Sequence, residues 1–299
     1  MQEKLKYENF EHLRLDSYLA KNYKDYSRAY FQKLIEQKKI FVNEMPEASS
    51  YKLKRGDCIT FEFKSEKASA ILPENINIEI IYEDDDIIAI NKHPAIVVHP
   101  SYGHLTGTLL NALAAYFKGK SQVYLVHRLD KDTSGIILFA KNEKSKISLS
   151  KQFQKRAVRK IYCAAVKGIV VESRGRIEAP IGRSPQNRKI MTVNPLAKKM
   201  AVTEFKVLAR KDGFSLLEIR IITGRTHQIR SHMKYINHPV VGDNQYGGPQ
   251  TINGQNYNRQ MLHSREIAFT HPKTSKNVHL IADFPDDMRD IFKLVRYTK

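Results

Sequence analysis

Helical periodicity and strand-like alternation follow one another near the start of the chain. Apolar residues repeat at helical spacing in residues 15–19 and again in residues 31–35. Residues 40–44 and 58–63 instead alternate between apolar and polar side chains, as half-buried strands do. The pattern predicts a small α+β module over residues 13–65, with two helices packed on a short sheet.

A second, longer region begins after a polar stretch, residues 66–76, whose composition is typical of a linker. Apolar spacing predicts helices at residues 106–117 and 226–237. Apolar or alternating runs predict strands within residues 82–92, 134–141, 160–170 and 201–222. Asp212-Gly213, in the last of these runs, is a strong hairpin signal. Residues 77–299 are therefore predicted to form a mixed, mainly antiparallel α+β domain.

The net charge of the chain indicates what kind of partner the protein binds. Hydrophobic residues make up 41% of the 299, enough for a core, but 50 Lys and Arg against 31 Asp and Glu leave a net charge of +19. Basic residues cluster in residues 151–160 and 184–199. A basic surface occurs on some proteins that have no polyanionic partner, but the clustering favours nucleic acid.

The remaining composition favours the cytoplasm. No run of about 18 apolar residues is present, so no membrane partner is expected. The polar N-terminal residues do not resemble a secretory signal. Cys58 and Cys163 favour reduced thiols and exclude a cysteine-based zinc site. We expect a cytoplasmic monomer.

Nearly the whole first module resembles the S4 RNA-binding domain. The elements RLD-x-YLA, SR, LI, VN and GD occur in the family's order, although Lys38 and Glu44 stand where the family usually has glycine. The resemblance implies RNA contacts from Arg14, Ser27, Arg28 and Lys33. Ser27 also fits the N-cap of the second helix. A small module of similar fold that does not touch RNA is the alternative.

The second region contains HRLDKDTSGIILFAK (127–141), in which charged residues stand directly before an apolar strand. It resembles the signature of the RluA/RluD family of pseudouridine synthases. Three further stretches agree with that family in the same order, namely residues 82–113, 160–168 and 223–247. The resemblance covers roughly residues 78–285. Ala95 stands where the family usually has glycine, so a local loop difference is expected there.

The resemblance assigns catalysis to Asp130, Tyr162 and Arg230. Conversion of uridine to pseudouridine breaks the C1′–N1 bond and forms a C1′–C5 bond without a redox change, so no cofactor is expected. Asp130 would act as a nucleophile at C1′ or as a base at the 2′ proton, and the sequence leaves both routes open. Arg230 would keep Asp130 ionised and oriented. Tyr162 would stack on the flipped uracil and assist proton removal at C5.

The same resemblance, with the basic clusters, implies RNA contacts around this site. The predicted contact residues are His127, Arg128, Lys160, Arg183, Arg225, His227 and Gln228. Asp132 is interpreted as a structural residue whose carboxylate accepts backbone N–H bonds in the turn. His127, His227 and His232 have no carboxylate or cysteine that completes a ligand set, so no metal is expected.

These features imply an enzyme that flips uridines out of RNA and isomerises them. The large-subunit ribosomal RNA members of the family are most similar, the D type ahead of the C type, which implies 23S ribosomal RNA and helix 69 in particular. Two alternatives remain open. DKDTS also fits the D-x-D-x-T pattern of phosphatases, in which Asp130 and Asp132 would share Mg²⁺. An S4 protein that binds RNA without catalysis is the other.

Overall fold

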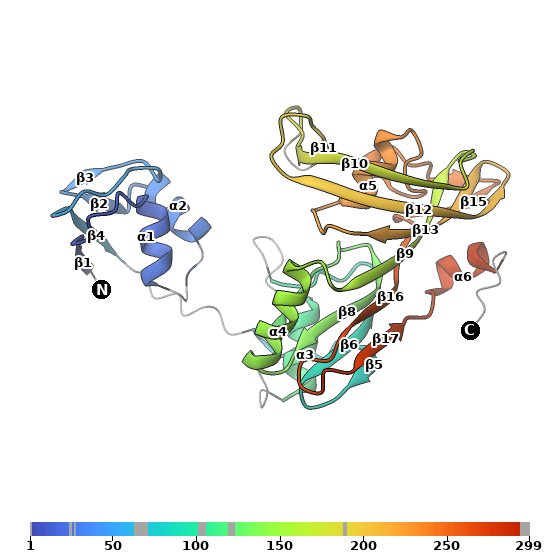
Figure 1. The fold of residues 1–299 in the computed structure, drawn as a ribbon, viewed down its shortest axis with the longest axis horizontal. Coiled ribbons are helices and arrows are strands. Elements are labelled where there is room, and N and C mark those ends of the chain that lie inside the picture. The colour runs from blue at the N-terminus through green and yellow to red at the C-terminus, as the bar shows by residue number, and fades with distance from the viewer. Residues whose placement is uncertain are drawn as a thin grey trace. The chain divides into compact units, whose positions relative to one another are not determined.

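The structure, a computed structural model, describes residues 2–23, 26, 28–62, 71–100, 106–118, 123–187 and 190–293. The chain divides into two compact units, residues 1–70 and 71–299 (Figure 1). Each unit has a hydrophobic core of its own. Within the described residues, no helix is long and apolar enough to cross a membrane.

The first unit packs two helices against a four-stranded sheet of order β1-β4-β2-β3. Its elements are β1 (Gln2–Lys6), α1 (Leu15–Asn22), α2 (Arg28–Glu36), β2 (Ile40–Val42), β3 (Met45–Pro46) and β4 (Cys58–Glu62). The predicted arrangement of two helices on a small sheet is confirmed. Strand β1 was not predicted, because QEKLK carries a single apolar residue and shows no clear alternation.

Three residues that replace family glycines have left-handed backbone. The angle φ is 53° at Lys38, 66° at Glu44 and 66° at Ala95. A Cβ makes this conformation costly, which is why glycine is usual there. The turns around these residues therefore keep the backbone conformation that glycine would favour.

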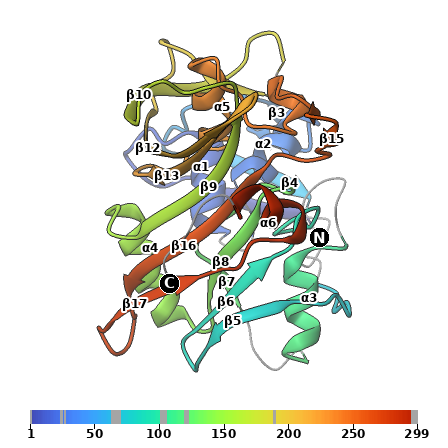
Figure 2. The same ribbon diagram turned by 90° about the vertical axis from the view of Figure 1, so that its right-hand side faces the viewer.

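The second unit is built on an 11-stranded sheet of order β11-β10-β12-β13-β9-β16-β8-β6-β5, with β17 paired to β16 and β7 to β8. Its strands are β5 (Glu79–Glu83), β6 (Ile87–Lys92), β7 (Tyr124–Leu125), β8 (Ser134–Ala140), β9 (Arg159–Lys167), β10 (Arg174–Arg183), β11 (Met191–Val193), β12 (Met200–Lys211), β13 (Phe214–Ile221), β16 (Leu262–Thr270) and β17 (Asn277–Ile281). Strands β16 and β8 are parallel, and the other pairs among the described strands are antiparallel. Figure 2 shows β9 and β16 between the two halves of the sheet. The expected fold class is confirmed.

Helices cover both faces of the β6–β8 half of the sheet. Ile88 and Ile90 pack in the same core as α3 (Leu109–Tyr116), whereas Ile87 and Ala89 pack in the same core as α4 (Glu143–Gln154). Burial on both faces explains why the first four residues of β6 are all apolar.

Further elements flank the other half of the sheet. Helix α5 (Gln228–Tyr235) contacts β10, β11 and β12, and α6 (Asp286–Phe292) follows β17 (Figure 1). A short helical turn, η1 (Asn244–Tyr246), and a small hairpin, β14 (Thr251–Ile252) with β15 (Gln255–Asn256), lie between α5 and β16 along the chain.

Strand β10 and helix α4 are among the elements of the second unit that had no clear signal in the sequence. Strand β10 contains Pro180, which normally argues against a paired strand. Helix α4 buries little more than Leu149 and Ser145, so its apolar stripe is too narrow to show a helical period.

Residues 71–76 are the described part of the predicted linker, and they lie along α3. The side-chain amide of Asn111 donates to the carbonyl of Leu72 (2.7 Å), and the Glu74 carboxylate accepts the N–H of Gly107 (2.9 Å). These contacts attach the segment to the second unit.

Gly135 brings β8 and β16 unusually close together. Its φ is 105°, and a Cβ built on it would lie 2.2 Å from the carbonyl oxygen of Ser264. Only glycine fits this contact. Gly135 is therefore required by the parallel pairing of β8 with β16, the one parallel pair among the described strands. It also sets the end of the loop that carries the charged residues of HRLDKDTSG.

Candidate active site

A cleft of about 500 Å³ opens between the loop before β8, the end of α4, the start of β9 and the start of α5. Its lining residues come from residues 126–133, 153–162 and 221–230, together with Leu262 on β16. Three of the four stretches that carry the family resemblance therefore contribute to one cavity.

Asp130 presents its carboxylate to this cleft. The side chain is 20% exposed, and its Oδ2 lies 3.2 Å from NH1 of Arg230 and 3.9 Å from Nε2 of His227. The carbonyl of Asp130 accepts the N–H of Thr133, which closes the turn. The carboxylate is thus fixed in direction by an arginine and still accessible to a ligand in the cleft.

Arg230 is buried and also binds a second carboxylate, that of Asp243. Its Nε and NH2 donate to the two oxygens of Asp243 at 2.6 and 2.9 Å, and NH2 also donates to Gln245 (2.9 Å). The guanidinium lies 4.7 Å from the centre of the Tyr246 ring. Burial lowers the pKa of Arg230, but Asp243 and Asp130 raise it further than burial lowers it. The group is a permanent cation with an immobilised fork.

Tyr162 forms the floor of the cleft on β9. It is 6% exposed and lies opposite Ser264 of β16. Burial raises the pKa of the Tyr162 phenol to about 12, while a hydrogen bond with Ser264 acts in the opposite direction. The phenol is therefore neutral at physiological pH and offers an aromatic surface rather than a base.

Two basic side chains, those of Lys92 and Arg259, donate hydrogen bonds to backbone carbonyls of the Asp130 loop. Lys92, at the end of β6, is 1% exposed and donates to the carbonyls of His93, Ile96 and Lys131 at 2.8 to 3.0 Å. Burial lowers the pKa of Lys92 to about 7. Arg259 NH1 donates to the carbonyl of Asp132 (3.0 Å). The sequence interpretation missed Lys92, although a lysine that ends a fully buried strand is itself a signal.

The carboxylates of Asp130 and Asp132 do not converge. Asp130 lines the large cleft, whereas Asp132 lines a separate cavity of about 350 Å³ with Arg259 and Asp287. Among the described residues no backbone N–H donates to the Asp132 carboxylate, so that part of the prediction is wrong, and the turn is held through the Asp132 carbonyl instead. Two carboxylates that face different cavities give no support to a shared Mg²⁺.

Six of the predicted RNA-contacting residues line the cleft, namely His127, Arg128, Lys160, Arg225, His227 and Gln228. Arg128 is exposed at the rim. Lys160 is partly buried, its Nζ lies 5.7 Å from the centre of the Phe153 ring, and burial lowers its pKa to about 8. Arg225 donates to the carbonyl of Met200 (3.3 Å).

Three others of these six also have partners inside the protein. His127 Nε2 accepts the N–H of Leu138 (2.9 Å), and burial lowers the His127 pKa to about 3, so the ring is neutral. His227 has a left-handed backbone (φ 52°), and its Nδ1 is 2.9 Å from the Tyr246 hydroxyl. The buried amide of Gln228 accepts two hydrogen bonds and donates two within the protein, which gives it a part in shaping the loop.

The other predicted RNA-contacting residues are Arg183 in the second unit and four residues in the first unit. Arg183 is exposed at the end of β10 and does not line the cleft. In the first unit Arg14 and Arg28 both donate to Asp16, a fully buried carboxylate, and each keeps about half of its side chain exposed. Lys33 is exposed on α2, and Ser27 lies outside the described residues.

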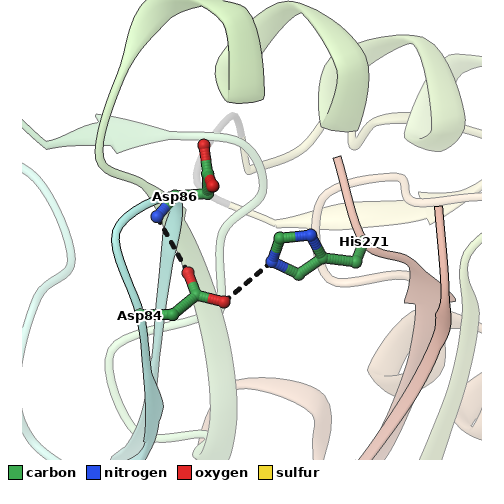
Figure 3. Close-up of side chains that lie close together, drawn as sticks. All are labelled: Asp84, Asp86 and His271. Atoms are coloured by element: carbon green, nitrogen blue, oxygen red, sulfur yellow. Dashed lines mark hydrogen bonds and ion pairs between the residues drawn. The ribbon is translucent and has the colours of Figure 1, made fainter. Parts of the chain in front are cut away.

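A cluster of possible metal ligands lies elsewhere in the second unit. Oxygen and nitrogen atoms of Asp84, Asp86 and His271 lie within 4.8 Å of one another (Figure 3). His271 Nδ1 accepts the N–H groups of Lys273 and Thr274, so Nε2 carries the proton and donates to Asp84 (2.8 Å).

The carboxylates of this cluster are also occupied by protein donors. Asp84 accepts the N–H groups of Asp86 and Ile87, and Asp86 accepts hydrogen bonds from Asn142 and Ser145 at the start of α4. The arrangement acts as a hydrogen-bonded clamp between the β5–β6 turn, α4 and the β16–β17 turn. The sequence interpretation did not single out these residues.

Comparison with known proteins shows which families the two units are similar to. Residues 86–235 match the RNA pseudouridylate synthase family, and residues 13–59 match the S4 domain. An uncharacterized RNA pseudouridine synthase of Bacillus subtilis, YlyB, is 40% identical over 95% of this chain and 94% of its own. The ribosomal large subunit pseudouridine synthase D of Neisseria meningitidis serogroup A is 41% identical over 95% of this chain and 79% of its own. The solved structure of human RNA pseudouridylate synthase domain containing 1 is 29% identical, with a TM-score of 0.59 over 71% of this chain and 85% of its own.

Proposed function

The chain belongs to the RNA pseudouridylate synthase family and carries an S4 domain, and we propose that it converts specific uridines of large-subunit ribosomal RNA to pseudouridine with Asp130 as the reacting group. The observation that carries the choice of residue is the Asp130 carboxylate, which faces the cleft 3.2 Å from the buried Arg230. Relatives named for the ribosomal large subunit support the substrate, with 23S RNA and its helix 69 as the first site to test. A ribosomal substrate agrees with the cytoplasmic location that the cysteine content favours.

The reaction requires a uracil that is detached, turned and reattached. A uridine flipped into the cleft places C1′ near the Asp130 carboxylate, which attacks C1′ or removes the 2′ proton. The C1′–N1 bond breaks, the C1′–C5 bond forms, and the proton on C5 is lost while N1 regains one. Arg230 orients the carboxylate before it reacts and again when it is released at the end of the reaction.

Tyr162 is proposed to hold the turning base by stacking. Its neutral phenol, with a pKa raised by burial to about 12, makes it a poor base at C5, so proton removal there passes to Asp130 or to solvent. Stacking on an aromatic ring contributes about 1–3 kcal/mol per base and does not require a fixed orientation of the base. This suits an intermediate that must rotate.

Mapping of pseudouridines tests the proposal directly. Purified protein is incubated with 23S transcripts, and modified positions are located by chemical labelling and primer extension, with the same sites checked in cells that lack the protein. New pseudouridines in 23S RNA, absent from the depleted cells, are expected. Modification of another RNA class with none in 23S RNA would refute the ribosomal substrate while leaving the reaction intact.

RNA affinity is expected to depend on the protonation of Lys160. Burial lowers its pKa to about 8, so the free enzyme loses this ammonium as pH rises from about 7 to about 9, and a bound phosphate would raise the pKa again. We expect the Kd for RNA to rise by up to about tenfold over this range. Lys160→Arg stays charged, and its Kd should rise much less over this range. Lys92 also titrates near pH 7 but does so in both proteins, and His127 remains neutral throughout. Identical profiles for the two proteins would contradict the role of Lys160.

The two units are expected to divide affinity and chemistry between them. Removal of residues 1–70 leaves the whole cleft and its separate core in place. The truncated protein should need more RNA for half-maximal rate and show a flatter dependence of affinity on salt, because phosphate contacts of the first unit are lost. Its rate at saturating RNA should change much less. A folded truncated protein with an unchanged salt dependence and no saturating rate would mean that the first unit helps to build the active site.

A further inference from the structure

Arg156 occupies the position after α4 where glycine is usual. Its φ is 58°, in the left-handed region. The N–H of Arg156 donates to Phe153 and that of Ala157 to Gln152, which is the Schellman pattern of hydrogen bonds at a helix end. Any residue with a Cβ adopts this conformation at a steric cost. Strained residues of this kind cluster at functional sites, where the side chain has a role beyond the fold.

The side chain of Arg156 is exposed and lines the cleft that holds Asp130. No carboxylate in the described part of the chain forms an ion pair with it, whereas Arg230 and Arg259 are each paired with an aspartate. Among the described lining residues, Asp130 is the only carboxylate, and it is engaged by Arg230. The wall formed by the end of α4 and the start of β9 therefore presents two cations, Arg156 and Lys160, without a counterion.

The dipole of α4 does not account for this placement. A cation near a helix C-terminus is favourable, but Lys151 and Lys155 already supply positive charge there. Neither of them has left-handed backbone. The dipole therefore gives no reason to place an arginine at the single position of this turn where glycine fits best.

We propose that Arg156 binds a phosphate of the RNA backbone next to the flipped nucleotide. The inference rests on the proposed function, because it assumes that the cleft receives a nucleotide of an RNA strand. The left-handed turn holds the guanidinium at the rim, and its planar fork matches two phosphate oxygens. Lys160, deeper on the same wall, adds a point charge. The position would thus be kept as arginine for binding although glycine would suit the fold better.

Arg156→Gly and Lys118→Gly form a matched pair of variants for the test. Lys118 is an exposed cation with φ 50° directly after α3, and it does not line the cleft. Each variant removes one positive charge and one strained residue, so each should raise the Tm slightly, by about 2 °C. Only Arg156→Gly should weaken RNA binding, with Kd raised about tenfold and the slope of log Kd against log salt reduced by about one. Arg156→Asn, which also tolerates left-handed backbone, provides a second measurement.

The outcomes separate this inference from the function on which it rests. Equal Kd values and equal salt slopes for the two glycine variants would overturn it, as would a lower Tm with normal binding, which would assign Arg156 to the fold. Pseudouridine formation by the unaltered protein is measured in the same assay. If that protein makes no pseudouridine in 23S RNA but Arg156→Gly still binds RNA more weakly, the phosphate contact stands and the proposed function fails.

Discussion

Asp130→Asn is expected to abolish pseudouridine formation, with a rate loss of about 10⁴-fold or more, while RNA affinity changes by less than about threefold. Asparagine keeps the size of the side chain and can still meet NH1 of Arg230, which lies 3.2 Å from Oδ2 of Asp130. It cannot attack C1′ or accept the 2′ proton at a useful rate. Single-turnover rates and filter binding on the same RNA measure the two effects separately.

Asp132→Asn is the matched control for this loss. Asp132 is two residues away in the same loop, but its carboxylate lines the other cavity and its carbonyl, which the substitution keeps, carries the contact with Arg259. Most of the activity should therefore remain. Inactive Asp132→Asn with active Asp130→Asn would mean that the wrong carboxylate has been assigned. Loss of RNA affinity in Asp130→Asn would instead make Asp130 a binding residue.

The contrast between these two aspartates shows how much about this loop can be predicted from the sequence. HRLDKDTSG sets several charges against a core strand, and no local pattern explains them. The explanation lies in distant partners, because the carbonyls of Lys131 and Asp132 are held by Lys92 and Arg259, which are 39 and 127 positions away. Only the fold brings these two basic side chains into contact with the loop.

The family resemblance named Asp130 and Arg230, which lie in contact in the structure, but it did not name the residues that support them. Asp130 and Arg230 are 100 positions apart, and the structure brings them into contact. Asp243, which anchors Arg230 from behind, lies in the stretch GDNQYG, which has the composition of a turn. Its 2% exposure and its pairing with Arg230 are properties of the packed molecule.

Secondary structure was predicted where apolar burial was regular. Strands β6 and β8 are buried on both faces, and most of each strand is an apolar run without alternation. Strand β10 is paired along its length in spite of Pro180, and α4 rests on a narrow apolar stripe, so neither shows a period. In these elements the neighbouring strands and cores decide the conformation, and local propensity does not.

Arg230→Lys is expected to lower the single-turnover rate by about 10²- to 10³-fold and the Tm of the second unit by roughly 5 °C. The guanidinium uses separate nitrogens for its two carboxylates, with NH1 toward Asp130 and with Nε and NH2 toward Asp243. One ammonium cannot reach both. If it stays with Asp243, Asp130 loses its orientation and its stabilising charge, and if it moves to Asp130, a carboxylate that is 2% exposed is left unpaired.

Arg176→Lys is the control for the same chemical change at the surface. Arg176 pairs with Glu178 and Glu204, but about half of its side chain is exposed, so its replacement should alter neither rate nor Tm measurably. A lower Tm with an unchanged rate in Arg230→Lys would mean that Arg230 serves only to hold Asp243. A lower rate with an unchanged Tm would mean that Asp243 finds other partners and that the contact with Asp130 carries the effect. The joint loss is expected because a single rigid fork both fixes the reacting carboxylate and neutralises the buried one behind it.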